Sequence, residues 1–128
     1  MKKQTKLRYG KGSEEHKNFL QRCWVGRTSL AGGVSQYTCW DPEFICPIGF
    51  VWCLLLSDTA TILHSYVRPD YRRIGVRTLI NEYIFYSVNK IQSSSGSKDG
   101  GEAFLKAYGY TFDKKRKDWF ILRPKGNK

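Results

Sequence analysis

The chain has 128 residues and carries 22 Lys and Arg against 11 Asp and Glu, a formal net charge of +11. Hydrophobic residues make up 41% and aromatic residues 15%, which excludes a disordered basic tail and predicts a single folded domain over residues 1–128. The longest apolar run, residues 48–56, is too short to cross a bilayer as a helix, and no apolar stretch follows the basic start. The sequence therefore predicts a cytoplasmic protein with no membrane partner.

Positive charge gathers in three segments, namely a basic arm at residues 1–11, residues 114–128, and four arginines between positions 68 and 77. Between Thr28 and Val67 there is no Lys or Arg. This distribution attracts nucleic acid, phosphorylated cofactors or acidic proteins and repels a free polyamine. The alternative is that the terminal lysines only keep the chain soluble.

Four cysteines lie at positions 23, 39, 46 and 53, and no two of them form a Cys-x-x-Cys pair. The spacing of the last three fits no structural zinc pattern. We therefore expect buried free thiols and no metal site.

The first predicted element is a helix, because Ser13 suits an N-cap and two glutamates follow in the first turn. Phe19, Leu20, Cys23 and Trp24 recur at helical spacing, so this helix is expected to end at Gly26. A turn at residues 31–33 then leads to a strand over 34–40, which Asp41-Pro42 ends.

The apolar run 48–56 predicts a strand covered on both faces, and residues 60–67 predict a second strand paired with it in a hairpin. Strict alternation would place Ala60, Ile62, His64 and Tyr66 on one face of that second strand.

The second half of the chain alternates between helices and strands. We expect an amphipathic helix from Val76 to about Asn89, a short strand near Ile91 and a flexible loop over 93–101. Asp99-x-x-Glu102 resembles a capping box for a helix ending at Gly109, before a hairpin of strands 110–112 and 119–122. This order predicts an α+β, or mixed α/β, fold with one central sheet.

The segment Tyr66–Ile80 contains the residues that point most clearly to a function. A strand ends, a turn rich in arginine and containing Gly75 follows, and a helix begins. A helix start offers unpaired amides and partial positive charge, so it is a natural anion site, to which Arg72, Arg73 and Arg77 add charge. The alternative is an ordinary turn with solvated arginines.

This segment resembles the GNAT superfamily of acyl-CoA-dependent N-acyltransferases. The stretch Val67-Arg68-Pro69-Asp70-Tyr71-Arg72 matches the lead-in to that family's pyrophosphate loop, and Arg72-Arg73-Ile74-Gly75 matches its first half. Arg77 stands where the family has a small residue. Downstream, Gly109-Tyr110 fits the turn after the family's last helix, so the resemblance covers roughly residues 45–122.

The resemblance implies a mixed central β-sheet flanked by helices, with a V-shaped splay between two parallel strands. It implies acetyl-CoA or another acyl-CoA as donor and transfer of the acyl group to an amine, which the charge places on a nucleic acid or an acidic protein. The backbone at Tyr66 and Val67 would pair with the pantetheine arm. The loop residues would hold the pyrophosphate: Arg72, Arg73, Ile74, Gly75, Val76, Arg77 and Thr78.

Candidates for the base are His64, Asp58 and Glu43, and we favour His64 because histidine side chains exchange protons near neutral pH. Tyr66 or Tyr108 would serve as the acid, because the tyrosine that the family often uses falls at Leu105. A histidine that is only packed in the sheet, and attack by an already neutral amine, remain alternatives.

A second hypothesis is a GNAT-like protein that binds nucleic acid or protein without catalysis, or that modifies nucleobases in the manner of enzymes of the phage Mom type. The substitutions at Leu105 and Arg77 favour it. A structural interaction protein is a third class.

Overall fold

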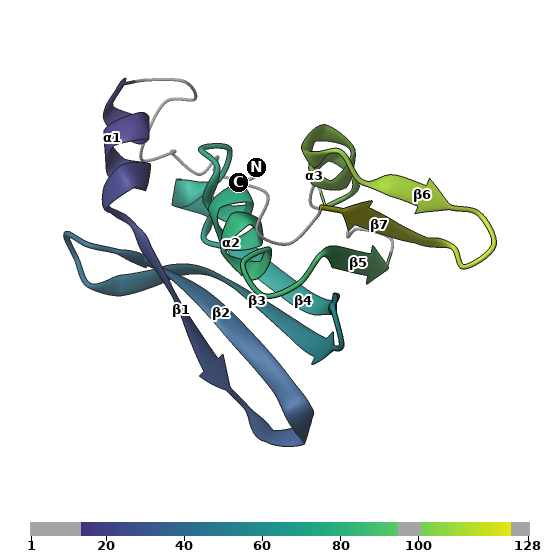
Figure 1. Cartoon of the computed structure of the whole chain (residues 1–128). Helices are drawn as coiled ribbons and strands as arrows, with labels where there is room; N and C mark the ends of the chain where they lie inside the picture. Colours follow the sequence, from purple (N-terminus) through teal and green to yellow (C-terminus); the bar gives the residue numbers. More distant parts are fainter. Residues whose placement is uncertain (1–13, 95–100, 124–128) are drawn as a thin grey trace, which may run out of the picture.

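The computed structural model describes residues 14–94 and 101–123 and forms one mixed sheet with the strand order β1-β2-β3-β4-β5-β7-β6 (Figure 1). This is the α+β architecture that the sequence predicted. Single 3₁₀ turns occur at Ala31–Gly33 and Pro69–Tyr71. The helices are α1 (Glu14–Arg22), α2 (Val76–Ile84) and α3 (Gly101–Tyr108), and the strands are β1 (Trp24–Ser29), β2 (Val34–Asp41), β3 (Cys46–Leu56), β4 (Thr59–Val67), β5 (Lys90–Ser94), β6 (Thr111–Asp113) and β7 (Asp118–Leu122).

The first helix is shorter than its apolar spacing predicted. It ends at Arg22, where the Cys23 N–H bonds to the Phe19 carbonyl, and β1 begins at Trp24. The predicted end at Gly26 is therefore wrong. Strand β1 pairs antiparallel with β2 from Trp24 opposite Trp40 onward, and this long-range pairing overrides the local helical pattern.

Strands β3 and β4 form the predicted hairpin, but a bulge interrupts it. Trp52 lies opposite His64 and Cys53 opposite Ile62, so Leu63 is an extra residue in β4. A one-residue insertion exchanges the faces of all later side chains. His64 and Tyr66 therefore lie on the face opposite to Ala60 and Ile62, and the prediction of a shared face is wrong.

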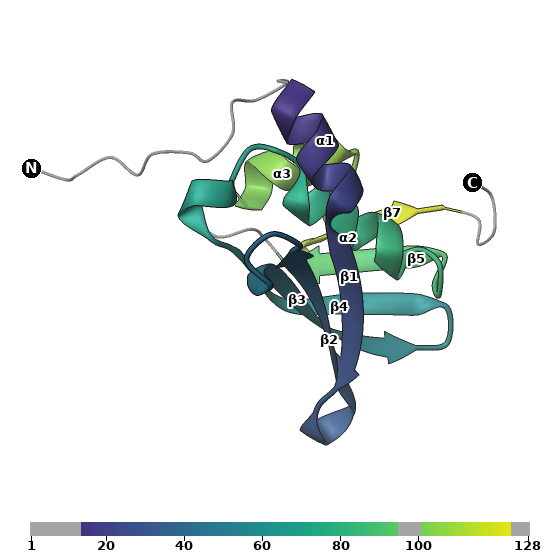
Figure 2. The same cartoon turned by 90° about the vertical axis from the view of Figure 1, so that its left-hand side faces the viewer.

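The helices gather on one side of the sheet, as Figure 2 shows, and bury a core there. Strand β3 is buried on that side only, because Phe50 is half-buried and Trp52 is 37% exposed on the other. The prediction that both faces are covered is wrong for this strand. The fully buried side chains on the helix side include Tyr37, Cys39, Val51, Ile80, Ile84 and Ile91.

Strands β4 and β5 are the two parallel neighbours, and they diverge. Their ladder runs only from Thr59 opposite Lys90 to Ile62 opposite Ser93. The remaining residues of β4, 63–67, extend past it, while β5 pairs with β7 on its other edge (Figure 1). This is the V-shaped splay that the resemblance implied.

Gly49 in β3 brings the start of α2 against the sheet. A Cβ at this position would lie 3.1 Å from the Tyr66 carbonyl oxygen and 3.1 Å from Cγ1 of Val76. Only a residue without a side chain allows this close approach. Gly49 thus sets the distance between the end of β4 and the first turn of α2.

Helix α2 ends at Ile84 and not near Asn89 as predicted, because the chain must turn back toward β5. The amides of Asn89 and Lys90 both bond to the Asp58 carbonyl, which fixes that return. Helix α3 ends as predicted before Gly109, whose φ is 111°.

Strand β5 takes in Ser93, so the predicted loop is shorter, and Gly101 already belongs to α3. Residues 95–100, which include Asp99 of the predicted capping box, lie outside the described residues, as does the basic arm. The last hairpin is confirmed as β6 and β7.

The four cysteines are free thiols, with Cys39 and Cys53 buried and Cys23 and Cys46 half-buried. Residues 14–94 and 101–123 contain no cluster of three or more His, Cys, Asp or Glu side chains placed to hold a metal ion. No helix in these two ranges has the length and apolar character needed to span a bilayer.

Candidate functional site

The first turn of α2 presents backbone amides without helical partners. Its first helical hydrogen bond runs from the Leu79 N–H to the Gly75 carbonyl at 2.9 Å, so the amides of residues 76–78 precede it. Gly75 has a φ of 103° and Arg73 a φ of 67°, both in the left-handed region. The backbone thus turns sharply into a helix start, which carries partial positive charge.

The turn before α2 is tied to the rest of the molecule through Tyr71. The Tyr71 hydroxyl donates to Oδ2 of the fully buried Asp41 at 2.5 Å, and Phe19 packs on the Tyr71 ring with centroids 5.7 Å apart. Asp41 also accepts the Glu43 amide at 2.8 Å. The anchor joins the turn to the end of β2 and to α1.

Arg72 lies between the end of β4 and the start of α2. Its Nε donates to the Val67 carbonyl at 2.8 Å, and its guanidinium lies 5.5 Å from the centre of the Tyr66 ring. Arg73 is exposed beside it. The two arginines expected from the sequence therefore do place charge at this helix start.

Arg77 turns inward, away from that group. It donates to Ser65 Oγ at 2.8 Å and to Asn81 Oδ1 at 3.3 Å, and its guanidinium lies 4.8 Å from the Phe104 ring centre. Burial lowers the pKa of Arg77, and the neighbouring Tyr110 opposes that shift. Its side chain therefore links α2, β4 and α3, while its amide remains in the first turn.

Beyond the parallel ladder, alternate residues of β4 direct their N–H and C=O groups either to β3 or to the opposite edge of the strand, which faces the splay. The Arg68 N–H bonds to the Ile48 carbonyl at 2.8 Å, so by the alternation of an antiparallel ladder Tyr66 also bonds to β3. The peptide groups of Ser65 and Val67 then turn toward the splay, as the bond from Arg72 to Val67 shows. Of the two backbone candidates, Val67 faces the splay and Tyr66 does not.

His64 and Tyr66 come together on the helix-free face. Both rings contact Phe50, with centroids 5.6 Å and 6.2 Å away, and His64 also lies 5.7 Å from Trp52. His64 is exposed and belongs to the part of β4 beyond the parallel ladder.

The other two candidate bases lie elsewhere. Asp58 precedes β4 at the strand end remote from Arg72, and Glu43 pairs with Arg22 at 3.0 Å. Of the three predicted bases, only His64 lies beside the splay.

Tyr108 lies on the helix side, away from His64 and Tyr66. Its hydroxyl donates to Glu82 Oε2, and Arg123 binds Glu82 Oε1 at 2.6 Å while lying 4.5 Å from the Phe85 ring centre. Burial and then the Glu82 carboxylate raise the pKa of Tyr108. Leu105, at the position of the family's usual tyrosine, is buried.

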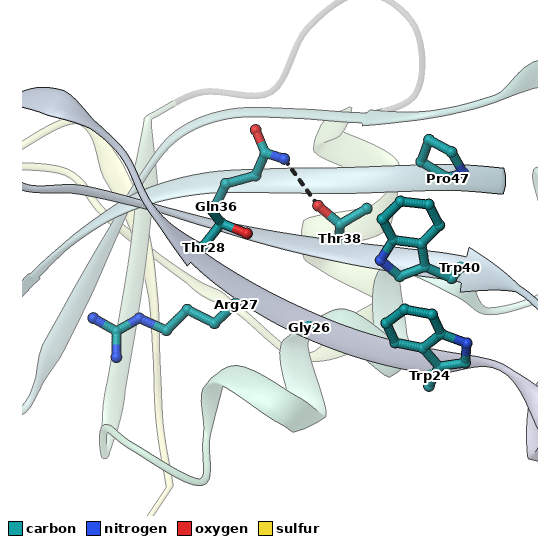
Figure 3. A pocket seen from close by; sticks show the side chains of 8 residues that line it. All are labelled: Trp24, Gly26, Arg27, Thr28, Gln36, Thr38, Trp40 and Pro47. Carbon is teal, nitrogen blue, oxygen red and sulfur yellow. Dashed lines mark hydrogen bonds between the residues drawn. The ribbon is translucent and has the colours of Figure 1, made fainter. Parts of the chain in front are cut away.

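A shallow hollow of about 390 Å³ lies on the helix-free face over β1, β2 and β3, and its lining includes none of the loop residues 72–78 (Figure 3). Trp24 and Trp40 stack there with ring centroids 5.2 Å apart and planes within 12° of parallel. Sequence reasoning missed this feature because it assigned Trp24 to a helix. It missed Ser65 because no local pattern marks the bulge that turns that residue toward Arg77.

Of the three comparisons with known proteins, only the one with solved structures finds similar proteins. No family model matches the sequence, and no curated protein matches it either. A GNAT acetyltransferase from Staphylococcus aureus superposes with a TM-score of 0.62 over 73% of this chain and 70% of that one, at 11% identity. YhhK from Escherichia coli, a putative N-acetyltransferase bound to coenzyme A, superposes with a TM-score of 0.60 over 83% and 84% of the two chains, at 19% identity.

The PaiA N-acetyltransferase from Thermoplasma acidophilum, in complex with coenzyme A, gives a TM-score of 0.56 at 15% identity over 71% of this chain and 60% of that one. The chain therefore has a divergent form of the GNAT N-acetyltransferase fold.

Proposed function

We propose that the protein is an N-acyltransferase that takes an acyl group from acetyl-CoA or another acyl-CoA and transfers it to an amine on an acidic macromolecule. The observation that carries the proposal is the start of α2, where free amides and two arginines adjoin the point at which β4 and β5 diverge. The fold shared with acetyltransferases that bind coenzyme A supports it.

The residues at this point fit an acyl-CoA. The amides of Ile74, Gly75, Val76, Arg77 and Thr78 would hold the pyrophosphate, because a helix start with a glycine lets an anion approach the backbone closely. Arg72 and the exposed Arg73 add positive charge there. The carbonyl and amide of Val67 would pair with the pantetheine arm along the open edge of β4.

The chemistry then needs proton transfer and charge stabilisation. A bound acyl-CoA supplies a thioester that an amine can attack. His64 would accept the proton that the amine loses, and the β4 amides that face the splay would hydrogen-bond the oxygen that gains charge. Tyr66 is the acid candidate on the same face, whereas the Tyr108 proton is engaged by Glu82.

Calorimetric titration with CoA and acetyl-CoA tests the donor site. We expect micromolar binding to the wild type, at least tenfold weaker binding to Arg72→Ala, and none to Gly75→Glu, which fills the anion site. Arg116→Ala, which removes an equal charge at the exposed β6–β7 turn, is the matched control and should bind as the wild type does.

The result that contradicts the proposal is absent CoA binding by the folded wild type, or equal weakening by Arg72→Ala and Arg116→Ala. Native mass spectrometry of the purified protein would identify a co-purified thioester directly.

A second candidate is a GNAT-like protein that binds or modifies nucleic acid without the usual acetyl transfer. The buried Leu105 at the usual tyrosine position favours it, as does the inward turn of Arg77. Binding of nucleic acid by a protein that does not bind CoA would support this candidate over the first.

A further inference from the structure

We infer that the helix-free face of the sheet is a binding platform for unpaired bases of a single-stranded nucleic acid. We call it the aromatic platform. It is made of the side chains that point to this face from the first four strands: Trp24, Thr28, Gln36, Thr38, Trp40, Pro47, Phe50, Trp52, His64 and Tyr66.

The platform consists of partly exposed aromatic rings on the twisted sheet. Trp24 is 49% exposed, Trp52 37% and Tyr66 43%, so these large rings remain in contact with water. Contiguous exposed aromatic surface of this kind marks an interaction site. Nothing in residues 14–94 or 101–123 covers it, because the described helices pack on the other side.

The rings form two groups, of which the first is stacked. Trp24 and Trp40 stack at one end (Figure 3), and Trp24 is 49% exposed. Phe50, Trp52, His64 and Tyr66 form the second group. The rings of the second group contact one another at tilts of 37° to 58°. Phe50 lies opposite Thr38, two residues from Trp40, so the groups are about 7 Å apart along a strand.

The polar groups between the rings suit base edges. The Trp52 indole N–H donates to Gln36 Oε1 at 2.7 Å, and Gln36 Nε2 donates to Thr38 Oγ1 at 2.9 Å. These contacts hold the half-buried Gln36 in place, while Thr38 itself is buried. The second amide N–H and the second lone pair of Gln36 are the groups that can pair with the edge of a base.

Charge selects a polyanion over the other occupants. No platform side chain is acidic, and Arg72 lies over the Tyr66 ring at its edge, with Arg68 and Arg73 beside it in the chain. Two copies of a chain with a net charge of +11 repel each other, whereas phosphates are attracted. Arg72 therefore supplies positive charge at the Tyr66 end of the platform, whereas Arg68 is paired with Asp70 at 3.6 Å. Positive charge combined with aromatic side chains is the common design for binding single strands.

This binding does not depend on the proposed acyl transfer. Combined with it, and resting on it, the platform would define the acceptor as an amine on an unpaired nucleobase, because His64 and Tyr66 belong both to the platform and to the candidate site.

Fluorescence anisotropy with labelled oligonucleotides of about 16 nucleotides tests the inference without CoA. We expect single-stranded DNA or RNA to bind at least tenfold more tightly than a duplex of the same sequence, and the two strands compared side by side identify the preferred sugar. Trp24→Ala and Trp52→Ala should each weaken single-strand binding about tenfold. Trp24→Phe, which keeps a ring, should retain most of it.

Phe112→Ala is the matched control, because it removes an exposed ring at the opposite edge of the sheet. The inference is overturned if duplex binds as well as single strand, or if the folded tryptophan variants bind like the wild type. It is also overturned if sedimentation shows a dimer that Trp24→Ala dissociates, which would assign the face to a second copy.

The same variants should bind CoA normally. If single-strand binding is absent while CoA still binds, the platform inference fails and the proposed function stands. If CoA binding is absent while single strands bind, the reverse holds.

Discussion

Single side chains fix the geometry of the turn that leads into α2. The Tyr71 hydroxyl is buried against the carboxylate of Asp41, which has no exposed surface. When a buried hydrogen-bond acceptor loses its donor, the free energy of removing that acceptor from water is no longer offset. This one contact therefore connects the stability of the fold to the shape of the candidate site.

Tyr71→Phe should lower the free energy of unfolding by about 1–3 kcal/mol, because Oδ2 of Asp41 then loses its donor. It should also weaken CoA binding, since the turn before α2 loses its anchor. Urea denaturation and calorimetry measure the two effects. Tyr83→Phe, on an exposed ring, is the control, and equal effects of both variants would contradict the account.

His64→Gln should slow acyl transfer by about 10²- to 10⁴-fold, because a base that accepts the amine proton is removed. CoA affinity should stay unchanged, since the imidazole lies on the face of β4 away from the helices. Single-turnover kinetics separates the two quantities. A variant that keeps the wild-type rate would assign His64 to binding on the platform alone.

At the scale of elements, the start of α2 depends on how closely it can approach β3 and β4. Gly49 leaves no room for a side chain between Val76 and the Tyr66 carbonyl. The helix start that forms the candidate anion site is thus positioned by a glycine in another element.

Gly49→Ala should destabilise the fold by about 1–3 kcal/mol, because the added Cβ forces Val76 and the backbone of β4 to move. The displaced amides should bind CoA less well. Thermal unfolding and titration measure both. Gly26→Ala in β1 is the matched control, since the nearest atom to its Cβ would be at an ordinary 3.5 Å; a Gly49 variant that behaves like it would refute the argument.

Elements with strong local signals could be predicted from the sequence. The β3–β4 hairpin, the start of α2 and the end of α3 at Gly109 each follow from turn chemistry and periodicity within a few residues. Strand β1 could not, because only its pairing with β2 distinguishes it from a continued helix.

The candidate site, too, could be predicted only where it depends on local sequence patterns. The loop residues Arg72 to Thr78 are contiguous and carry a recognisable pattern. The face of the sheet on which His64 lies, and the partner of Arg77, depend on a bulge and on contacts between distant elements. The aromatic platform could not be predicted, because its side chains come from four strands that lie side by side only in the folded sheet.

At the scale of the whole molecule, the core buries thiol and phenol groups that can lose a proton. Burial raises the pKa of the Cys53 thiol from 9.0 to about 11, and it raises the pKa of Tyr37 and Tyr110 as well. Each of these groups binds its proton more tightly in the folded chain than in the unfolded chain. The stability that they contribute is present below the unfolded pKa and is lost as the pH rises through the folded one.

The free energy of unfolding should therefore fall between about pH 9 and 11, by about 2–3 kcal/mol from Cys53 alone. Urea denaturation midpoints at about pH 8 and about pH 10.5 measure the loss. Cys53→Ala should show a smaller loss over the same interval. Stability that is constant over this range would show that the Cys53 thiol has the same pKa in the folded and the unfolded chain, and would contradict the account.

The bulge in β4 determines which face of the sheet each later side chain of this strand points to. Deleting Leu63 would change no charge and remove no catalytic group, yet it would drive an imidazole and a phenol into the apolar interior and expel the hydroxyl that receives Arg77. The side chains at the end of β4 would then lie on the opposite faces of the sheet. The number of residues in this strand therefore determines the geometry of the candidate site as strictly as the identity of any residue in it.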